Sequence, residues 1–129
     1  MHDNRIKGEN ILNNQPEILA QRQLDAYNKQ DIEAFLEVYA NDVEVRTFPA
    51  NELTYQGIDR MRARYSALFE QNPNQHAALL SRIVKGNIVI DHEHVTGRTS
   101  GEETEAIAMY EIEQGKISKV WFVSPTKGA

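Results

Sequence analysis

The chain of 129 residues contains no cysteine. This absence excludes disulfides, thiolate metal sites, iron–sulfur clusters and a cysteine nucleophile, and it fits a reducing compartment. No apolar run approaches the roughly 20 residues that span a bilayer. The first fifteen residues also lack the apolar core of a signal peptide. The sequence therefore predicts a cytoplasmic protein that does not engage a membrane.

Basic residues are also scarce, with 14 Lys and Arg against 19 Asp and Glu and a net charge of −5. Nucleic-acid binding depends on neutralising phosphates with basic side chains, so we expect no nucleic-acid partner. The seven glycines are scattered among turns and form no phosphate-cradling loop, so we expect no nucleotide cofactor. The apolar content of 40% is enough for the core of one domain.

Three segments show the apolar spacing of amphipathic helices. The first begins at Pro16, which suits a first helical turn, and the second follows Asp31, a favourable N-cap. The third begins near Gly57 and stops at Asn72-Pro73. The stripe expected for the second helix is Ile32, Phe35, Leu36 and Tyr39, and that for the third is Ile58, Met61, Tyr65, Leu68 and Phe69.

The remaining segments alternate as strands do. Residues 43–48 form the first strand, and a short strand near 53–56 could pair with it. Later strands are expected near 77–85, 88–97, 104–113 and 116–124, separated by turns that contain glycine. Helices gathered before an antiparallel meander indicate an α+β fold. We expect one domain over 16–124, between a mobile tail at 1–15 and a C-terminal tail at 125–129.

Three stretches carry a resemblance to a known family: AYNKQDIEAFLEVYANDVEV, YQGIDRMRARYSALF and YEIEQGKISKVWFV. Over about residues 16–124 the chain resembles the nuclear-transport-factor-2-like superfamily, which includes ketosteroid isomerases and SnoaL-like polyketide cyclases. The resemblance implies a cone-shaped curved antiparallel sheet packed on three helices, with a pocket between them. It also implies a homodimer formed through the outer sheet face.

Ketosteroid isomerases use an Asp base on the first strand, with a Tyr and a protonated Asp as oxyanion donors. By resemblance these positions fall at about Thr47, at about Gln23 and near Ala106 to Ala108. Threonine cannot serve as a proton-shuttling base near neutral pH, and alanine cannot donate to an oxyanion. We therefore do not expect the ketosteroid isomerase mechanism itself.

One strand carries two carboxylates on an otherwise apolar face. Val89, Asp91, Glu93 and Val95 alternate onto the same side of residues 88–95. If that side lines the pocket, the two carboxylates point into it about 7 Å apart. Burial and mutual repulsion would raise at least one pKa, which suits a general acid or base. We predict Asp91 and Glu93 as catalytic residues.

Arginines and aromatic residues could complete such a site by polarising a carbonyl and packing on the substrate. The predicted substrate-binding residues are Arg46, Phe48, Tyr65, Phe69, Arg82 and Trp121. Arg62 and Tyr55 are further possibilities. Each aromatic residue could instead belong to the core, and a buried Arg–carboxylate pair could simply hold the sheet to a helix. Tyr65 is the strongest functional choice, because a hydroxyl in an apolar cavity needs a partner.

His92 and His94 have the spacing of metal ligands on one strand face. Only His76 could supply a third histidine. If Asp91 and Glu93 face inward, these histidines face outward, so we expect no metal site.

Three functions remain open from the sequence. The first is a cofactor-independent isomerase, cyclase or dehydratase that acts by proton transfer on a small apolar molecule. The second is a non-catalytic ligand-binding domain with the same pocket. The third is a dimerising structural module whose cone is filled by its own side chains.

Overall fold

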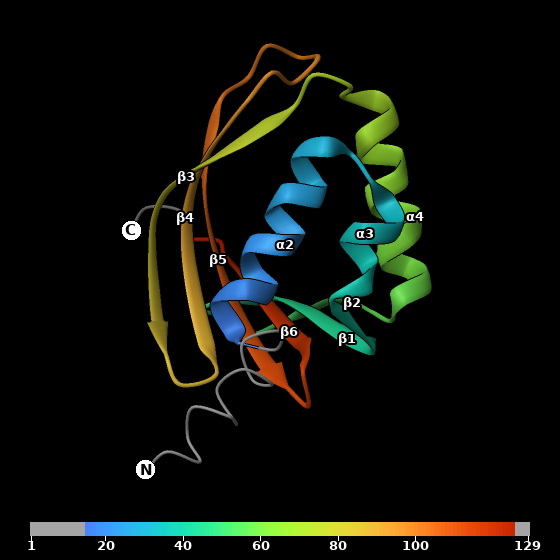
Figure 1. The fold of residues 1–129 in the computed structure, drawn as a ribbon. Coiled ribbons are helices and arrows are strands. Elements are labelled where there is room, and N and C mark those ends of the chain that lie inside the picture. The colour runs from blue at the N-terminus through green and yellow to red at the C-terminus, as the bar shows by residue number, and fades with distance from the viewer. Residues whose placement is uncertain (1–14, 126–129) are drawn as a thin grey trace.

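The computed structural model describes residues 15–125, which form three helices and one curved, open sheet (Figure 1). The helices are α2 (Pro16–Lys29), α3 (Ile32–Glu37) and α4 (Ile58–Gln71). The strands are β1 (Tyr39–Phe48), β2 (Leu53–Gln56), β3 (His76–Lys85), β4 (Ile88–Thr96), β5 (Thr104–Glu113) and β6 (Lys116–Val123). The predicted α+β class is confirmed, while residues 1–14 and 126–129 of the two predicted tails lie outside the described residues.

Local signals set the helix ends as expected. Pro16 opens α2, and the side chain of Asp31 accepts a hydrogen bond from the Ala34 amide at 3.2 Å at the start of α3. The expectation for Tyr39 was wrong, because α3 ends at Glu37 and Tyr39 is the first residue of β1. No helix within residues 15–125 is long and apolar enough to cross a bilayer.

The sheet order is β2-β1-β6-β5-β4-β3. The hairpin β1–β2 and the meander β3–β6 are antiparallel, as predicted. The pairing of β1 with β6 is parallel, so the sheet is mixed rather than wholly antiparallel. Alternation along a strand cannot reveal this pairing, because it depends on which distant strand returns beside β1.

The two faces of the sheet have different characters. The helices cover the inner face, where Val89, Tyr110, Val120 and Val45 are opposite one another on successive strands and are all buried (Figure 1). The opposite face carries a second row of neighbours across four strands, which we call the outer row: Ile83, Ile90, Met109 and Trp121.

An aromatic cluster fixes the helices to one another over the inner face. Phe35 of α3 lies between Tyr27 of α2 and the α4 residues Tyr65 and Phe69, with ring centroids 4.5 to 6.2 Å apart. Tilted and edge-on contacts of this kind are favourable for aromatic rings. The cluster holds α2 and α4 in place beside the space that forms the site.

Candidate functional site

A cavity of about 500 Å³ lies against the inner sheet face and is bordered by α2 and α4. All five tyrosines of the chain line it: Tyr27, Tyr39, Tyr55, Tyr65 and Tyr110. Apolar side chains from both layers, including Leu24 and Phe122, complete the wall. The site is therefore an apolar space with several hydroxyl groups.

Glu93 on β4 is the one carboxylic acid among the residues that line this cavity. Within residues 15–125 its carboxylate makes no hydrogen bond or ion pair with another side chain. Burial, and next the negative charge of Asp91, raise the pKa of Glu93 to about 7, with the positive charge of Arg82 opposing the rise. A carboxyl group with this pKa can both accept and return a proton near neutral pH.

Asp91 has a different environment, although it points to the same side of the strand. It is completely buried, and Arg82 donates to both of its oxygens, from Nε at 2.7 Å and from a terminal nitrogen at 2.9 Å. Arg82 also donates to Gln21 Oε1 of α2 at 2.9 Å. Neither Asp91 nor Arg82 lines the cavity. This pair ties the sheet to α2, which is the structural alternative that the sequence left open.

The phenols around Glu93 are held in the neutral state. Burial raises the pKa of Tyr39, Tyr65 and Tyr110, and the negative charge of Glu93 adds to the rise in each. Gln23 orders two of them, since its Nε2 donates to Tyr110 and its Oε1 accepts from Tyr39, both at 3.1 Å. Neutral phenols are hydrogen-bond donors, so this site can stabilise negative charge that develops on a ligand.

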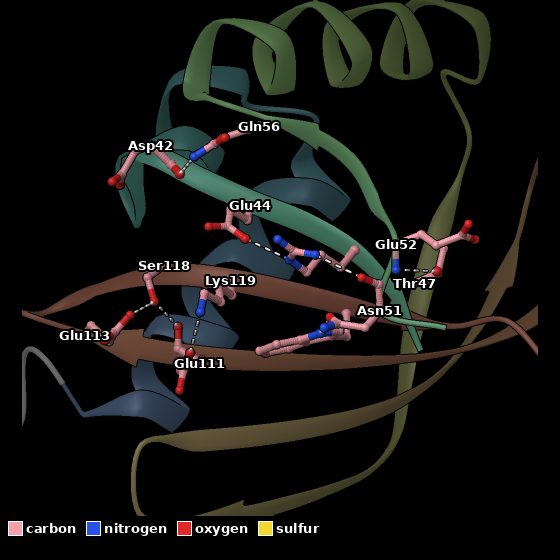
Figure 2. Close-up of polar contacts among 12 residues, drawn as sticks. Asp42, Glu44, Thr47, Asn51, Glu52, Gln56, Glu111, Glu113, Ser118 and Lys119 are labelled. Carbon is pink, nitrogen blue, oxygen red and sulfur yellow. Dashed lines mark hydrogen bonds and ion pairs between the residues drawn. The ribbon is translucent and has the colours of Figure 1, made fainter. Parts of the chain in front are cut away.

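Three arginines border the cavity, and each is held differently. Arg46 donates to Glu44 Oε1 at 2.7 Å and to the Asn51 carbonyl at 2.9 Å (both partners are labelled in Figure 2). Arg98 donates to Gln75 at 2.9 Å. Arg64 of α4 lies over the ring of Tyr55, 4.6 Å from its centroid. Sequence reasoning missed Arg64 and Arg98.

The predicted aromatic residues divide between the cavity and other places. Tyr65 lines the cavity, whereas Phe69 is buried in the aromatic cluster. Phe48 is 45% exposed, and Trp121 lies in the outer row, where its Nε1 donates to Asn51 Oδ1 at 2.9 Å. Phe122, the neighbour of Trp121, lines the cavity instead. Strand alternation could have predicted this position of Phe122, because Phe122 shares a face of β6 with the buried Val120.

The three positions that correspond to ketosteroid isomerase chemistry do border the cavity, at Gln23, Thr47 and Ala106. The positions implied by the resemblance therefore border the candidate site, while their residue types differ from those of a ketosteroid isomerase. Tyr27, Tyr39 and Tyr110 were also missed. Composition gave no signal for them, because only the fold shows that all five tyrosines face this space.

The remaining predicted groups lie elsewhere. His92 contacts Glu105 at 2.7 Å and His94 contacts Glu103 at 3.1 Å, and all four side chains are well exposed to solvent. Arg62 pairs with Glu33 of α3, away from the cavity. In the part of the chain that is described, no three His, Asp or Glu side chains gather in a geometry that could hold a metal ion.

Comparisons with known proteins agree with this architecture. An uncharacterized cystatin-fold protein from Novosphingobium aromaticivorans is 27% identical, with a TM-score of 0.74 over 82% of this chain and 95% of the other. A candidate polyketide cyclase from Sinorhizobium meliloti is 22% identical, with a TM-score of 0.68 over 81% and 92%. A candidate ketosteroid isomerase from Kribbella flavida is 21% identical, with a TM-score of 0.68 over 89% and 81%.

No protein of curated function matches the chain. The model of the SnoaL-like domain matches residues 20–120, which is most of the sequence. The protein therefore belongs to the SnoaL-like domain family, within the nuclear-transport-factor-2-like superfamily.

Proposed function

We propose that this protein is a cofactor-independent enzyme that moves a proton on a small, largely apolar carbonyl compound. The observation that carries the proposal is Glu93, an unpaired carboxyl group with a pKa of about 7 in a cavity lined by phenols. Double-bond isomerisation of a ketone and aldol-type cyclisation can both begin with removal of a proton next to a carbonyl group. The names of the Sinorhizobium and Kribbella relatives, a cyclase and an isomerase, support this reaction class.

In the proposed reaction the ionised Glu93 takes a proton from the carbon beside the carbonyl. The electron pair of that C–H bond moves onto the carbonyl oxygen, which becomes an enolate. Tyr65 lines the same cavity, and its hydroxyl has no hydrogen-bond partner within residues 15–125, so it is the donor proposed for that oxygen. Protonated Glu93 then returns a proton to carbon. Asp91 does not reach the cavity and acts as a positioning residue through Arg82.

The test measures exchange of the α-protons of 2-tetralone, an apolar ketone, for deuterium by NMR in D2O. We expect the wild-type protein to accelerate exchange and Glu93→Gln to lose at least about 100-fold of that acceleration, because an amide cannot act as the base. Glu105→Gln is the matched control, since Glu105 pairs with His92 outside the cavity and should leave exchange unchanged. Equal exchange by wild type and Glu93→Gln would show that Glu93 is not the base.

The size of the cavity favours the two ligand-binding hypotheses over a self-filled cone. Its volume of about 500 Å³ exceeds the roughly 300 Å³ at the lower end of small-molecule sites. A purely binding protein would be stabilised against heat by 2-tetralone without exchanging its protons. That result would replace the proposed enzyme with a ligand-binding domain.

We also propose that two copies of the chain pair through the outer sheet face. The outer row places apolar side chains on four adjacent strands, and Ile83 at its edge is 62% exposed. Ile107, on the same face of β5, is 37% exposed. Pairing would remove this apolar surface from water, which is the main favourable term in protein association.

A further inference from the structure

The cavity wall contains a hydroxyl group that is fully shielded from solvent and has no partner in the fold. Tyr55 on β2 is 5% exposed, and its hydroxyl oxygen is the one fully shielded side-chain oxygen or nitrogen within residues 15–125 that lacks a hydrogen-bond partner. A buried hydroxyl without a partner is costly, so such groups are rare in folded proteins. Because Tyr55 also lines the cavity, a bound ligand can supply the missing partner.

A positive charge without an acidic partner lies over the ring that carries this hydroxyl. The Arg64 guanidinium is 4.6 Å from the centroid of the Tyr55 ring, and Arg64 borders the same cavity. Arg64 makes no ion pair with any carboxylate in the described segment. Arg46, in contrast, is neutralised by Glu44. Arg98 also lacks an acidic partner within residues 15–125, but its Nε donates to Gln75. Arg64 is therefore the uncompensated arginine that contacts Tyr55.

We propose that Tyr55 and Arg64 form a subsite for a carboxylate, and that the natural ligand is a small molecule with an apolar body and one carboxylate group. One phenolic O–H and one guanidinium provide donors for the two oxygens of a carboxylate, and the single positive charge balances its single negative charge. The tyrosine-lined wall takes the apolar body. As a statement about a substrate, the inference rests on the proposed function and deepens it.

The two ends of the cavity then have separate roles. Glu93 is on β4, whereas Tyr55 and Arg64 are on β2 and α4. In the sheet, β4 and β2 are separated by β5, β6 and β1. A ligand whose carboxylate is held at Tyr55 and Arg64 presents the rest of its body toward Glu93. The subsite therefore orients the molecule as well as selecting it.

The experiment compares two probes of nearly the same shape, 2-naphthoate and its neutral amide 2-naphthamide, by titration calorimetry at neutral pH. We expect the wild-type protein to bind the acid about tenfold more tightly, which corresponds to one charge-assisted hydrogen bond. Tyr55→Phe and Arg64→Gln should each lose most of this preference. Tyr55→Phe keeps the ring in place, and circular dichroism checks that each variant is folded.

Arg60→Gln is the matched control, because Arg60 is an exposed arginine on the same helix that does not line the cavity. It removes one positive charge and should keep the full preference for the acid, and Arg64→Lys should keep part of it. The proposal is wrong if the wild-type protein shows no saturable binding of the acid or binds both probes equally. It is also wrong if Arg98→Gln removes the preference and Arg64→Gln does not.

The inference and the proposed function can fail separately. If Glu93→Gln loses deuterium exchange but the wild-type protein does not prefer 2-naphthoate over its amide, the proposed carboxylate subsite is wrong and the proposed catalytic role of Glu93 is supported. If the preference depends on Tyr55 and Arg64 but Glu93→Gln exchanges normally, the subsite stands and the catalytic proposal fails.

Discussion

Asp91 and Glu93 lie two residues apart on one strand face, yet their surroundings differ. Arg82 reaches both oxygens of Asp91, and Asp91 is sealed beneath α2. Glu93 is two residues farther along β4, opposite Ala106, and lines the cavity. Burial without a guanidinium partner favours the protonated state of Glu93. The pair therefore divides into a structural carboxylate and a titrating one.

The first prediction concerns the pH dependence of stability. The pKa of Glu93 is about 7 in the folded protein and near 4.5 in the unfolded chain. As the pH rises between these values, the unfolded chain loses this proton first, so the folded state loses stability. Glu93→Gln should be more stable than wild type by an amount on the order of 2 kcal/mol above pH 7, allowing for solvent in the cavity. Urea unfolding across this pH range measures the difference.

The gain from Glu93→Gln should vanish below the unfolded pKa, where the carboxyl group is neutral in both states. Glu102→Gln, on an exposed turn, is the control and should follow wild type at every pH. A gain that is independent of pH would contradict a raised pKa for Glu93.

The second prediction concerns the coupling of Asp91 to Glu93. Asp91→Asn removes the negative charge that helps to raise the pKa of Glu93 and leaves the Arg82 charge uncompensated beside it. Both changes favour ionised Glu93, so its pKa should fall below 7. Carbon-13 NMR titration of the Glu93 carboxyl group measures this directly. The variant should also lose ~3 kcal/mol of stability, because a buried ion pair loses one partner. An unchanged or higher pKa would show that Asp91 does not influence the base.

The third prediction concerns the rate of proton transfer. If Glu93 is the base, exchange of 2-tetralone requires its ionised form, so the rate should rise with pH and level off above about 7. In Asp91→Asn the same rise should move to lower pH. A rate profile that does not move with the NMR-measured pKa of Glu93 would separate the titration from catalysis.

At the scale of elements, the strand β4 and the turn after it depend on a close backbone approach at Gly97. Its φ is +76°, and a Cβ built there would lie 2.0 Å from the carbonyl oxygen of Asn74, in the segment before β3. Only glycine accepts this combination. The approach helps to hold Arg98 at the rim of the cavity, where it donates to Gln75.

The fourth prediction follows from this contact. Gly97→Ala should lower the free energy of unfolding by ~3 kcal/mol, because it combines a left-handed backbone with a steric clash. Gly101→Ala is the matched control, since Gly101 has a similar φ of +81° and no atom within 4 Å of the added Cβ. It should cost only ~1 kcal/mol, from backbone strain. Equal losses in thermal or urea unfolding would mean that the segment of Asn74 moves away.

Periodicity predicted the elements well, because each depends on neighbours in sequence. The bounds of α2, α4 and the meander agree closely with the predicted segments. The same alternation places Phe48 opposite in direction to Val43 and Val45, and those valines are buried against the helices. Phe48 therefore faces out, which alternation implied once the buried face was known. The sequence alone does not show which face of this strand is buried, because that depends on how the strand packs against the helices.

At the scale of the whole molecule, the curved sheet presents its inner face to the helices and the cavity, and its outer row to solvent (Figure 1). The fifth prediction concerns the dimer proposed for that outer face. Ile83→Glu should convert a dimer into a monomer, because it places a charge in the apolar contact. Leu53→Glu is the control, since Leu53 is 48% exposed but lies on β2 at the opposite edge of the sheet. Light scattering after size exclusion measures the mass, and a monomeric wild-type protein at all concentrations would exclude the dimer.

The cytoplasmic location stays a prediction from the sequence.

The apolar periodicity and the order of the elements were enough to predict the α+β fold, because they depend on neighbours in sequence. Three stretches of sequence carried the resemblance that implied the family. The pairing of Asp91 with Arg82, the gathering of five tyrosines and the meeting of Tyr55 with Arg64 were decided only by the tertiary structure. These contacts join residues distant in sequence, and their chemistry depends on burial and on nearby charge. Local patterns could identify the two carboxylates, but only the folded sheet decided which one lines the cavity.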